Sequence, residues 1–352
     1  MNKIHFILIL IIYSSCGSHY LPKAYEKQVS KRDTTITIST NLASDSFEIQ
    51  YLGCGGLNIK KGKDHILVDP FFSNQTVSTI IKSKSIFSDT NIINSAFGKI
   101  DYKDAQACLI THAHYDHLLD VPYISKKYFN HQLQVYGSKT TINTLIASKL
   151  DSSYLHKTEP FAANQMNIGK WIYTSTDSTC RFMPVEYEHA PHFKMGFFTL
   201  KFYKGDYNLP PQDLSKADEW LEGKTYSYII DFLKNGKVDK RIYVLSGGAA
   251  NPNIGFVSQI EGLKETSIDL MVLCVASHAN VKNYPQAIIE AHTPSYVLGV
   301  HWEDFFVQYA SEKHNKAVRM TNVPKFFDKI NGLKKSPKFL ISKPLTRFTF
   351  RY

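Results

Sequence analysis

Residues Thr111 to Asp120 read THAHYDHLLD and decide the fold. The preceding run, Ala107 to Thr111, is apolar and has the character of a β-strand. In an extended chain residues i and i+2 point to the same side, so His112 and His114 can bind one metal ion together. The spacing therefore predicts a metal site where this strand ends.

A second ion is predicted beside the first. Asp116 and His117 follow where the chain turns, and their carboxylate and imidazole groups suit zinc, iron or manganese. A cation would lower the pKa of a coordinated water to near neutrality, giving a hydroxide, and would polarise a carbonyl or phosphoryl oxygen under attack. If only one ion binds, Asp116 is free to act as a general base; if two bind, it is a ligand.

The H-x-H-x-D-H pattern resembles the signature of the metallo-β-lactamase superfamily. Three other segments resemble that family in the expected order: YLGCGGLNIKKGKDHILVDPFFS (Tyr51 to Ser73), PVEYEHAPHF (Pro184 to Phe193) and VLGVHWEDFF (Val297 to Phe306). The resemblance implies an α/β fold, the four-layer αββα sandwich, and a metal-dependent hydrolase that uses one or two ions of Zn²⁺, with manganese or iron as alternatives.

The resemblance also implies a role for each matching residue. Six of them match metal ligands: His112, His114 and His189 for the first ion, and Asp116, His117 and His301 for the second. Asp69 matches the aspartate that supports the metal loop from behind. His192 is the alternative to His189, which is preferred because it comes first after its strand.

One position of the family pattern lacks its usual residue. The metal-bridging aspartate would end the strand in RIYVLSGGAA (Arg241 to Ala250), where Ser246, Gly247 and Gly248 stand instead. Two neighbouring cations need negative charge between them, so the second ion is expected to bind weakly or not at all. His278 follows a predicted strand and is expected to border the site, as a compensating catalytic or ligand group or as a contact for substrate or solvent.

The opening hairpin and VDPFF most resemble the branch containing ascorbate-phosphate lactonase and the N-acylphosphatidylethanolamine phospholipases. We therefore expect cleavage of an ester, a lactone or a phosphodiester in a small-molecule or lipid substrate, since the fold alone does not fix the substrate. The alternatives are β-lactam hydrolysis and a degenerate, metal-stabilised binding lipoprotein.

The N-terminus predicts export. MNKIHFILILIIYSSC (residues 1–16) has an early lysine, a short apolar run and small residues before Cys16. Cys16 resembles the lipidated cysteine of a bacterial lipobox, which places the protein at the cell envelope on a lipid anchor; an ordinary signal peptide is the alternative. The net charge of +10 comes from scattered lysines, which argues against nucleic-acid binding and favours an acidic substrate or lipid surface. The sequence does not indicate an oligomeric state.

The rest of the chain is predicted to be one catalytic domain over residues 45–352, after a polar tether at 17–44 that can add an edge strand. Helices are expected at Ser138 to Lys149, Tyr284 to Ala291 and Phe305 to Ala317. Ser73 to Ala105 and Lys204 to Lys224 look like insertions that either shape a substrate pocket or decorate the surface. The widely spaced cysteines Cys54, Cys108, Cys180 and Cys274 are expected to be buried free thiols; the alternative in an exported protein is a disulfide, which the spacing alone cannot pair.

Overall fold

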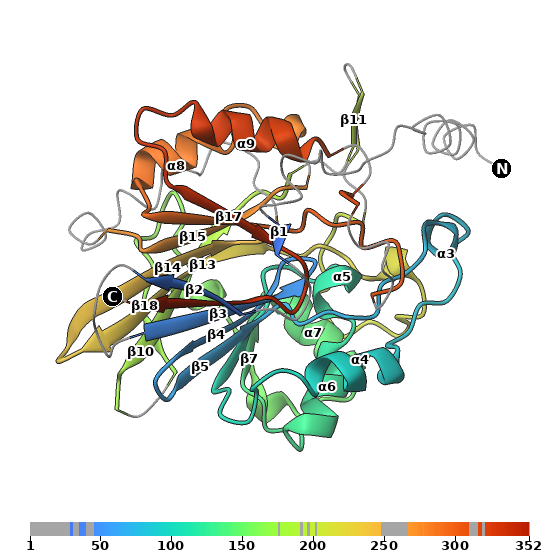
Figure 1. The fold of residues 1–352 in the computed structure, drawn as a ribbon. Helices are drawn as coiled ribbons and strands as arrows, with labels where there is room; N and C mark the ends of the chain where they lie inside the picture. Colours follow the sequence, from blue (N-terminus) through green and yellow to red (C-terminus); the bar gives the residue numbers. More distant parts are fainter. Residues whose placement is uncertain are drawn as a thin grey trace.

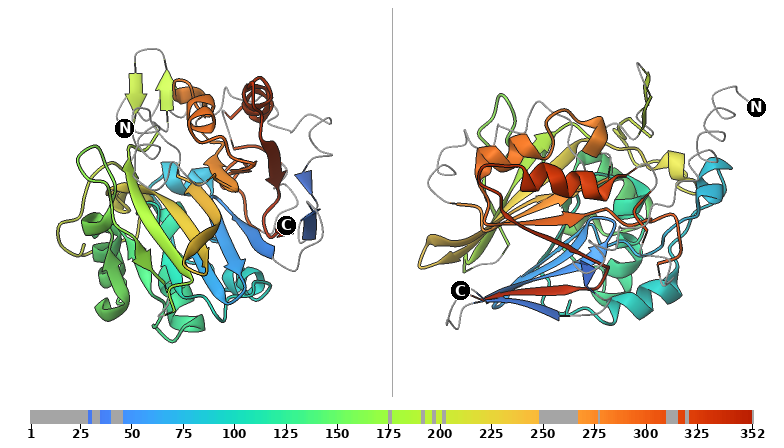
Figure 2. Two further views of the ribbon diagram at one scale, coloured as in Figure 1. Left: turned by 90° about the vertical axis from the view of Figure 1, so that its left-hand side faces the viewer. Right: turned by 45° about the horizontal axis from the view of Figure 1, so that its top comes forward.

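Two eight-stranded sheets pack face to face in the computed structural model, with helices on both outer sides (Figure 1). The structure describes residues 29–30, 35–39, 46–174, 177–190, 193–195, 198–200, 203–247, 267–276, 278–309, 316–318 and 321–351. Figure 2 shows the same layers from two further sides. This arrangement confirms the predicted four-layer αββα sandwich. The signal segment with Cys16, the alternative ligand His192, and Gly248 lie outside the described residues.

The first sheet carries the strand that leads into the metal loop. Its spatial order is β2 (Thr35–Ser39), β18 (Arg347–Arg351), β3 (Ser46–Gly53), β4 (Gly56–Lys61), β5 (Asp64–Val68), β6 (Ala107–Leu109), β7 (Val135–Gly137) and β8 (Leu155–Lys157). Strands β3 to β5 form an antiparallel meander. Strands β5 to β8 pair in parallel, because helices make the connections between them.

The helices on this sheet are α3 (Val77–Ile81), α4 (Thr90–Phe97), α5 (Tyr115–Leu118), α6 (Val121–Tyr128) and α7 (Lys139–Ala147). Their apolar side chains form a core with the outer face of the sheet, in which Ile93, Phe97, Ile124 and Leu145 are fully buried. The segment from Ser73 to Ala105 therefore contributes helix α4 to the core, whereas α3 has no buried residue and only its partly buried Ile80 packs against that core.

The second sheet lies under the other helical layer. Its order is β1 (Val29–Ser30), β17 (Lys338–Ser342), β16 (Tyr296–Val300), β15 (Leu270–Cys274), β14 (Lys237–Leu245), β13 (Thr225–Lys234), β10 (Cys180–Tyr187) and β9 (Ile172–Tyr173). Helices α8 (Gln286–His292) and α9 (Val323–Asn331) cover its outer face (Figure 1). A separate hairpin contains β11 (Phe193–Met195) and β12 (Phe198–Leu200).

Local sequence explains several of these elements. Strand β15 reads LMVLC and is buried at every position, as expected for a central strand covered on both faces. Strands β13 and β14 are joined at Asn235 and Gly236, which both have positive φ (53° and 73°), the pair favoured in a tight hairpin turn. Part of the polar N-terminal segment adds β2 to the sheet edge, as the sequence allowed.

The helix predicted over residues 305–317 does not form in the part of it that the structure describes. Residues 305–309 make turns, and Ala317 pairs with Glu303 in an isolated bridge. The Asp304 carboxylate accepts a hydrogen bond from the Phe306 amide (3.1 Å), as in an Asx-turn, and no helix follows it in the described residues of 305–317. Tyr309 also donates to the Leu52 carbonyl at 2.6 Å, so tertiary contacts outweigh the helical pattern.

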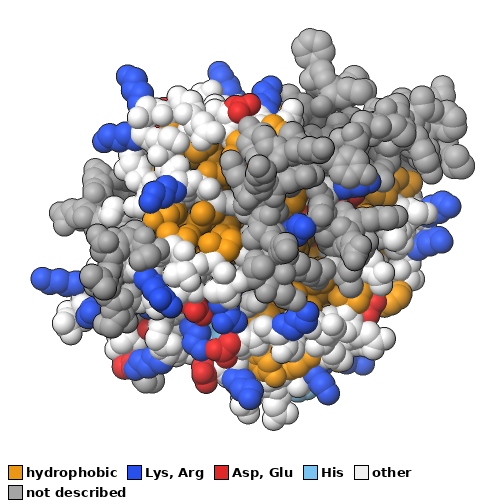
Figure 3. Space-filling model, viewed as in Figure 1, with side chains coloured by type: hydrophobic (Ala, Val, Ile, Leu, Met, Phe, Trp, Pro, Cys, Tyr) orange, Lys and Arg blue, Asp and Glu red, His pale blue; other side chains and the backbone are white. Residues whose placement is uncertain are grey.

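Charge is spread over the surface without a single basic face in view. Figure 3 shows lysine and arginine side chains dispersed over one side, with acidic side chains near some of them. Among the described residues, no helix combines the length and the apolar character needed to cross a bilayer.

Candidate metal centre

The loop that carries the motif Thr111 to Asp120, here called the metal loop, starts where β6 ends. Backbone hydrogen bonds hold it on both sides. The Thr111 carbonyl accepts from the Tyr226 amide (2.8 Å), and the Ala113 amide donates to the Glu222 carbonyl (3.0 Å). Glu222 belongs to the second insertion, Lys204 to Lys224, so that segment supports the loop directly. His114 then forms the N-cap position of the short helix α5, with extended backbone angles.

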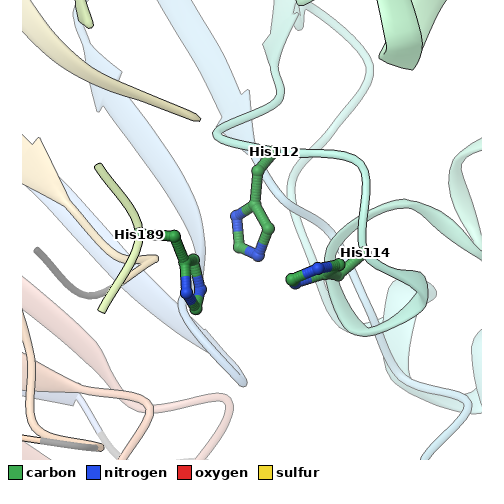
Figure 4. A group of neighbouring side chains, drawn as sticks. All are labelled: His112, His114 and His189. Atoms are coloured by element: carbon green, nitrogen blue, oxygen red, sulfur yellow. The ribbon is translucent and has the colours of Figure 1, made fainter. Parts of the chain in front are cut away.

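Three histidines converge from this loop and from the end of β10 (Figure 4). His112, His114 and His189 each place a ring nitrogen within 4.8 Å of the others. Their ring centroids are 4.6, 4.7 and 5.3 Å apart, and all three side chains are buried. The His189 Nδ1 donates to the Ala190 carbonyl at 2.7 Å, which fixes the orientation of the ring. Three buried imidazoles at this spacing fit a zinc-type site.

A second cluster lies beside the first and contains a residue that the motif analysis had not assigned. Cys54, Asp116 and His301 each offer a ligand atom within 4.8 Å of the other two. His117 lies between the two clusters, with its ring centroid 4.1 Å from that of His112 and 5.4 Å from that of His301. The structure thus brings together all six residues that match metal ligands and adds a thiol.

Asp69 is fully buried behind the metal loop and accepts four hydrogen bonds. One oxygen accepts from the Thr111 amide (2.8 Å). The other accepts from the Thr111 hydroxyl, from His117 Nδ1 (2.9 Å) and from the Ser246 hydroxyl (3.1 Å). Asp69 adopts a positive φ of 40°, which is uncommon outside glycine but is adopted by aspartate more often than by most residues. This position orients His117 so that its Nε2 faces the centre.

Ser246 and Gly247 explain how the site is shaped where the family's aspartate is missing. The Ser246 hydroxyl points at Asp69, so it belongs to the support behind the metal loop. A Cβ added at Gly247 would lie 2.9 Å from His112 Nδ1, which is too close for any other residue without movement. The glycine lets the backbone approach the first histidine cluster closely.

The electrostatics of the second cluster are dominated by Asp116 and its histidine neighbours. Burial alone would raise the pKa of Asp116, but His117 and His301 outweigh it and hold that pKa well below its usual range. Burial likewise opposes charge on His117, yet the carboxylates of Asp69 and Asp116 raise the pKa of its imidazole. The carboxylate therefore stays ionised and available to a cation.

His278 lies apart from both clusters and is not assigned to the site. It sits in the short 3₁₀ turn His278–Asn280, where Nε2 donates to the Asn322 carbonyl (2.9 Å) and Nδ1 is 3.5 Å from Lys329 Nζ. Burial and the Lys329 cation lower the pKa of His278 to about 4. Both ring nitrogens are thus engaged with α9 and its N-cap, and the predicted compensation by this residue is not seen.

Comparison with known proteins gives the family. The family model described as "Beta-lactamase superfamily domain" matches residues 64–246, about half of the chain. A UPF0173 metal-dependent hydrolase of Flavobacterium johnsoniae is 25% identical over 285 residues, which cover 80% of this chain and 93% of that protein.

A solved structure with a TM-score of 0.50 has a similar fold, and a second has a TM-score just below that value. Igni18, described as a novel metallo hydrolase from Ignicoccus hospitalis, is 14% identical, with a TM-score of 0.50 over 87% of this chain and 99% of its own. The metallo-β-lactamase fold protein YhfI from Bacillus subtilis is also 14% identical, with a TM-score of 0.48 over 87% and 100% of the two chains. Together with the matched family model, the two sheets and the buried histidine loop lead to one conclusion: the chain belongs to the metallo-β-lactamase superfamily of metal-dependent hydrolases.

Proposed function

We propose that this protein hydrolyses an ester, lactone or phosphodiester bond at a zinc-type metal centre, in a small-molecule or lipid substrate of the cell envelope. The observation that supports this most directly is the buried cluster of His112, His114 and His189, whose ring nitrogens converge without any added group. A site that had lost its function would be expected to lose several of these residues, so we favour an enzyme over a degenerate binding protein.

Some residues of the centre would bind the metal ions, and others orient the side chains of these ligands. His112, His114 and His189 would bind the first ion; Asp116, His117 and His301 would serve the second. Asp116 Oδ2 lies 3.4 Å from His301 Nε2 and 3.7 Å from His117 Nε2, so we assign it a ligand role and not that of a general base. A bound divalent cation in such a site lowers the pKa of a coordinated water and polarises the carbonyl or phosphoryl oxygen of the substrate.

The substrate class rests on two further supports. The net charge of +10 favours an acidic substrate or an anionic lipid surface. The resemblance of the segment around VDPFF to lactonases and phospholipases points to lactone or phosphodiester chemistry. The envelope location and the lipid anchor at Cys16 are proposed from the N-terminal sequence.

Removing one histidine of the first cluster tests the proposal. His114→Ala is expected to lower the metal content of the purified protein and to abolish hydrolysis of generic phosphodiester, lactone and β-lactam substrates, because the remaining two imidazoles cannot complete the site. Metal content is measured by atomic spectrometry and hydrolysis by product release.

His156→Ala is a matched control, since His156 stacks on Tyr136 at 4.6 Å and belongs to neither cluster. This variant is expected to keep both metal and activity. The proposal would be contradicted if the wild-type protein bound no metal and cleaved none of these substrates. Cleavage of the β-lactam alone would overturn the substrate class.

A further inference from the structure

We propose that Cys54 is a thiolate ligand of the second metal ion, together with Asp116 and His301. The inference rests on the proposed function of the same centre and adds a ligand that the family pattern does not supply. It makes the centre asymmetric, with a first site of three nitrogens and a second site of sulfur, oxygen and nitrogen.

The distances between the three ligand atoms carry the argument. Cys54 Sγ lies 3.6 Å from Asp116 Oδ2 and 3.6 Å from His301 Nε2, and these last two atoms are 3.4 Å apart. Around a tetrahedral zinc ion, with bonds of about 2.3 Å to sulfur and about 2.1 Å to nitrogen or oxygen, neighbouring ligand atoms are separated by about 3.4 to 3.6 Å. The three atoms already have the spacing of three corners of one coordination sphere.

His117 lies beside these three ligands. Its Nε2 is 3.7 Å from the same Asp116 oxygen, while its Nδ1 is fixed by Asp69. A histidine whose other nitrogen binds a buried carboxylate is the usual arrangement for a metal ligand. Among the described residues, the group of atoms within 4.8 Å of one another contains Cys54, Asp116 and His301 only, so the second site has three protein donors at the spacing of one coordination sphere, with His117 at its edge.

The backbone of the β3–β4 hairpin turns Cys54 inward. Gly53, Cys54 and Gly55 have successive positive φ angles of 106°, 53° and 104°. For a cysteine this conformation is strained, so it persists only where the surroundings impose it. The side chain is 2% exposed, and its sulfur is directed at the metal cluster.

A buried glutamate fixes the backbone of two proposed ligands together. Glu303 accepts from the Cys54 amide at 2.6 Å through one oxygen and from the Tyr51 hydroxyl through the other. The Tyr51 oxygen in turn accepts from the His301 amide at 3.0 Å. Contacts within the protein therefore hold Cys54 and His301 in register, although 247 positions separate them in the chain.

The thiolate also supplies negative charge that the missing aspartate would have given. Ser246 does not provide it, because its hydroxyl is directed to Asp69. A sulfur anion beside the Asp116 carboxylate would neutralise the second cation and would favour zinc or cobalt over magnesium or calcium.

The test loads the full-length apoprotein with Co²⁺ and records its absorption spectrum. A cysteine thiolate bound to Co²⁺ gives an intense charge-transfer band in the near ultraviolet, which nitrogen and oxygen ligands do not give. Wild-type protein is expected to show this band and to bind about two equivalents of metal. Cys54→Ala is expected to lose the band and to bind about one equivalent, because its first site is intact.

Cys180→Ala is the matched control, since Cys180 is a buried free thiol in neither cluster; it is expected to keep the band. The inference would be overturned if the wild-type protein showed no band or if the band persisted in Cys54→Ala. If the variant does not fold, the spectrum of the wild-type protein alone decides the question. A thiolate band without hydrolysis of any substrate would contradict the proposed function but support Cys54 as a metal ligand. Hydrolysis by a wild-type protein that lacks the band would support the proposed function and contradict the role of Cys54.

Discussion

At the scale of single residues, Asp69 connects several parts of the centre. Its carboxylate binds the metal loop through Thr111, orients His117 and accepts from the Ser246 hydroxyl. The direction of the His117 ring therefore depends on it.

Asp69→Asn tests this supporting role. An amide cannot accept at both positions while facing these donors, so the His117 ring loses its orientation. We expect metal affinity to fall about 10- to 100-fold, as is typical when such a partner of a ligand is removed. The affinity is measured by competition with a chromogenic chelator. Asp101→Asn, at an exposed ion pair with Lys60, is the control, and equal affinities in both variants would contradict the role.

At the scale of residues, the sequence predicts which candidate ligands come together where these are neighbours in the chain. His112, His114, Asp116 and His117 share one strand end and one turn, so their spacing determines which side they face. Cys54 was assigned only as a buried thiol, because its closeness to His301 depends on the Glu303 and Tyr51 contacts across the whole domain. The signal that was available is the G-C-G sequence, in which flanking glycines permit positive φ angles.

At the scale of elements, helix α9 is docked on the second sheet partly through His278. The sequence placed this residue correctly after strand β15 but could not show that α9 would occupy both of its nitrogens. Strand positions were predictable because buried strands read as apolar runs. The structure of the segment after Trp302 was not predictable from its helical spacing. Hydrogen bonds of Asp304 to the Phe306 amide and of Tyr309 to the Leu52 carbonyl form there instead of a helix.

His278 should make folding stability depend on pH in a defined window. Burial lowers the pKa of His278 from its ordinary value of 6.5 to about 4, so the unfolded chain takes up this proton more readily than the folded one. The free energy of unfolding therefore falls as the pH drops from about 6.5 to about 4. His278→Gln keeps a donor for the Asn322 carbonyl without a titratable group, and urea unfolding across this range should give a shallower pH dependence. An unchanged slope would contradict the assignment.

At the scale of the whole molecule, strand β18 lies between β2 and β3 and so connects β2 to the rest of the first sheet. Phe350 stacks on Phe47 at a centroid distance of 4.5 Å, so the last described strand packs against the first long one. Residues from both ends of the chain thus belong to one sheet. The overall architecture was predictable because four motifs in a fixed order matched one family; the pairing of β2 and β18 was not, since edge order leaves little trace in composition.

The proposed lipid anchor belongs to this scale as well. Cys16→Ser is expected to abolish incorporation of a labelled fatty acid and to move the protein from the membrane to the soluble fraction, because one thiol carries the modification. Metal content and hydrolysis should not change. Cys180→Ser serves as the control and should keep the label; a label that persists in Cys16→Ser would rule out the anchor.

The contacts of Glu303 separate the two sites by the parts of the chain that each one needs. All ligands of the first site come from residues up to His189, but Tyr226 and Gly247 shape it, so that site also needs β13 and the end of β14. The second site needs in addition His301 and the glutamate two residues later. An ion bound there would therefore join the opening hairpin of the protein to its final third.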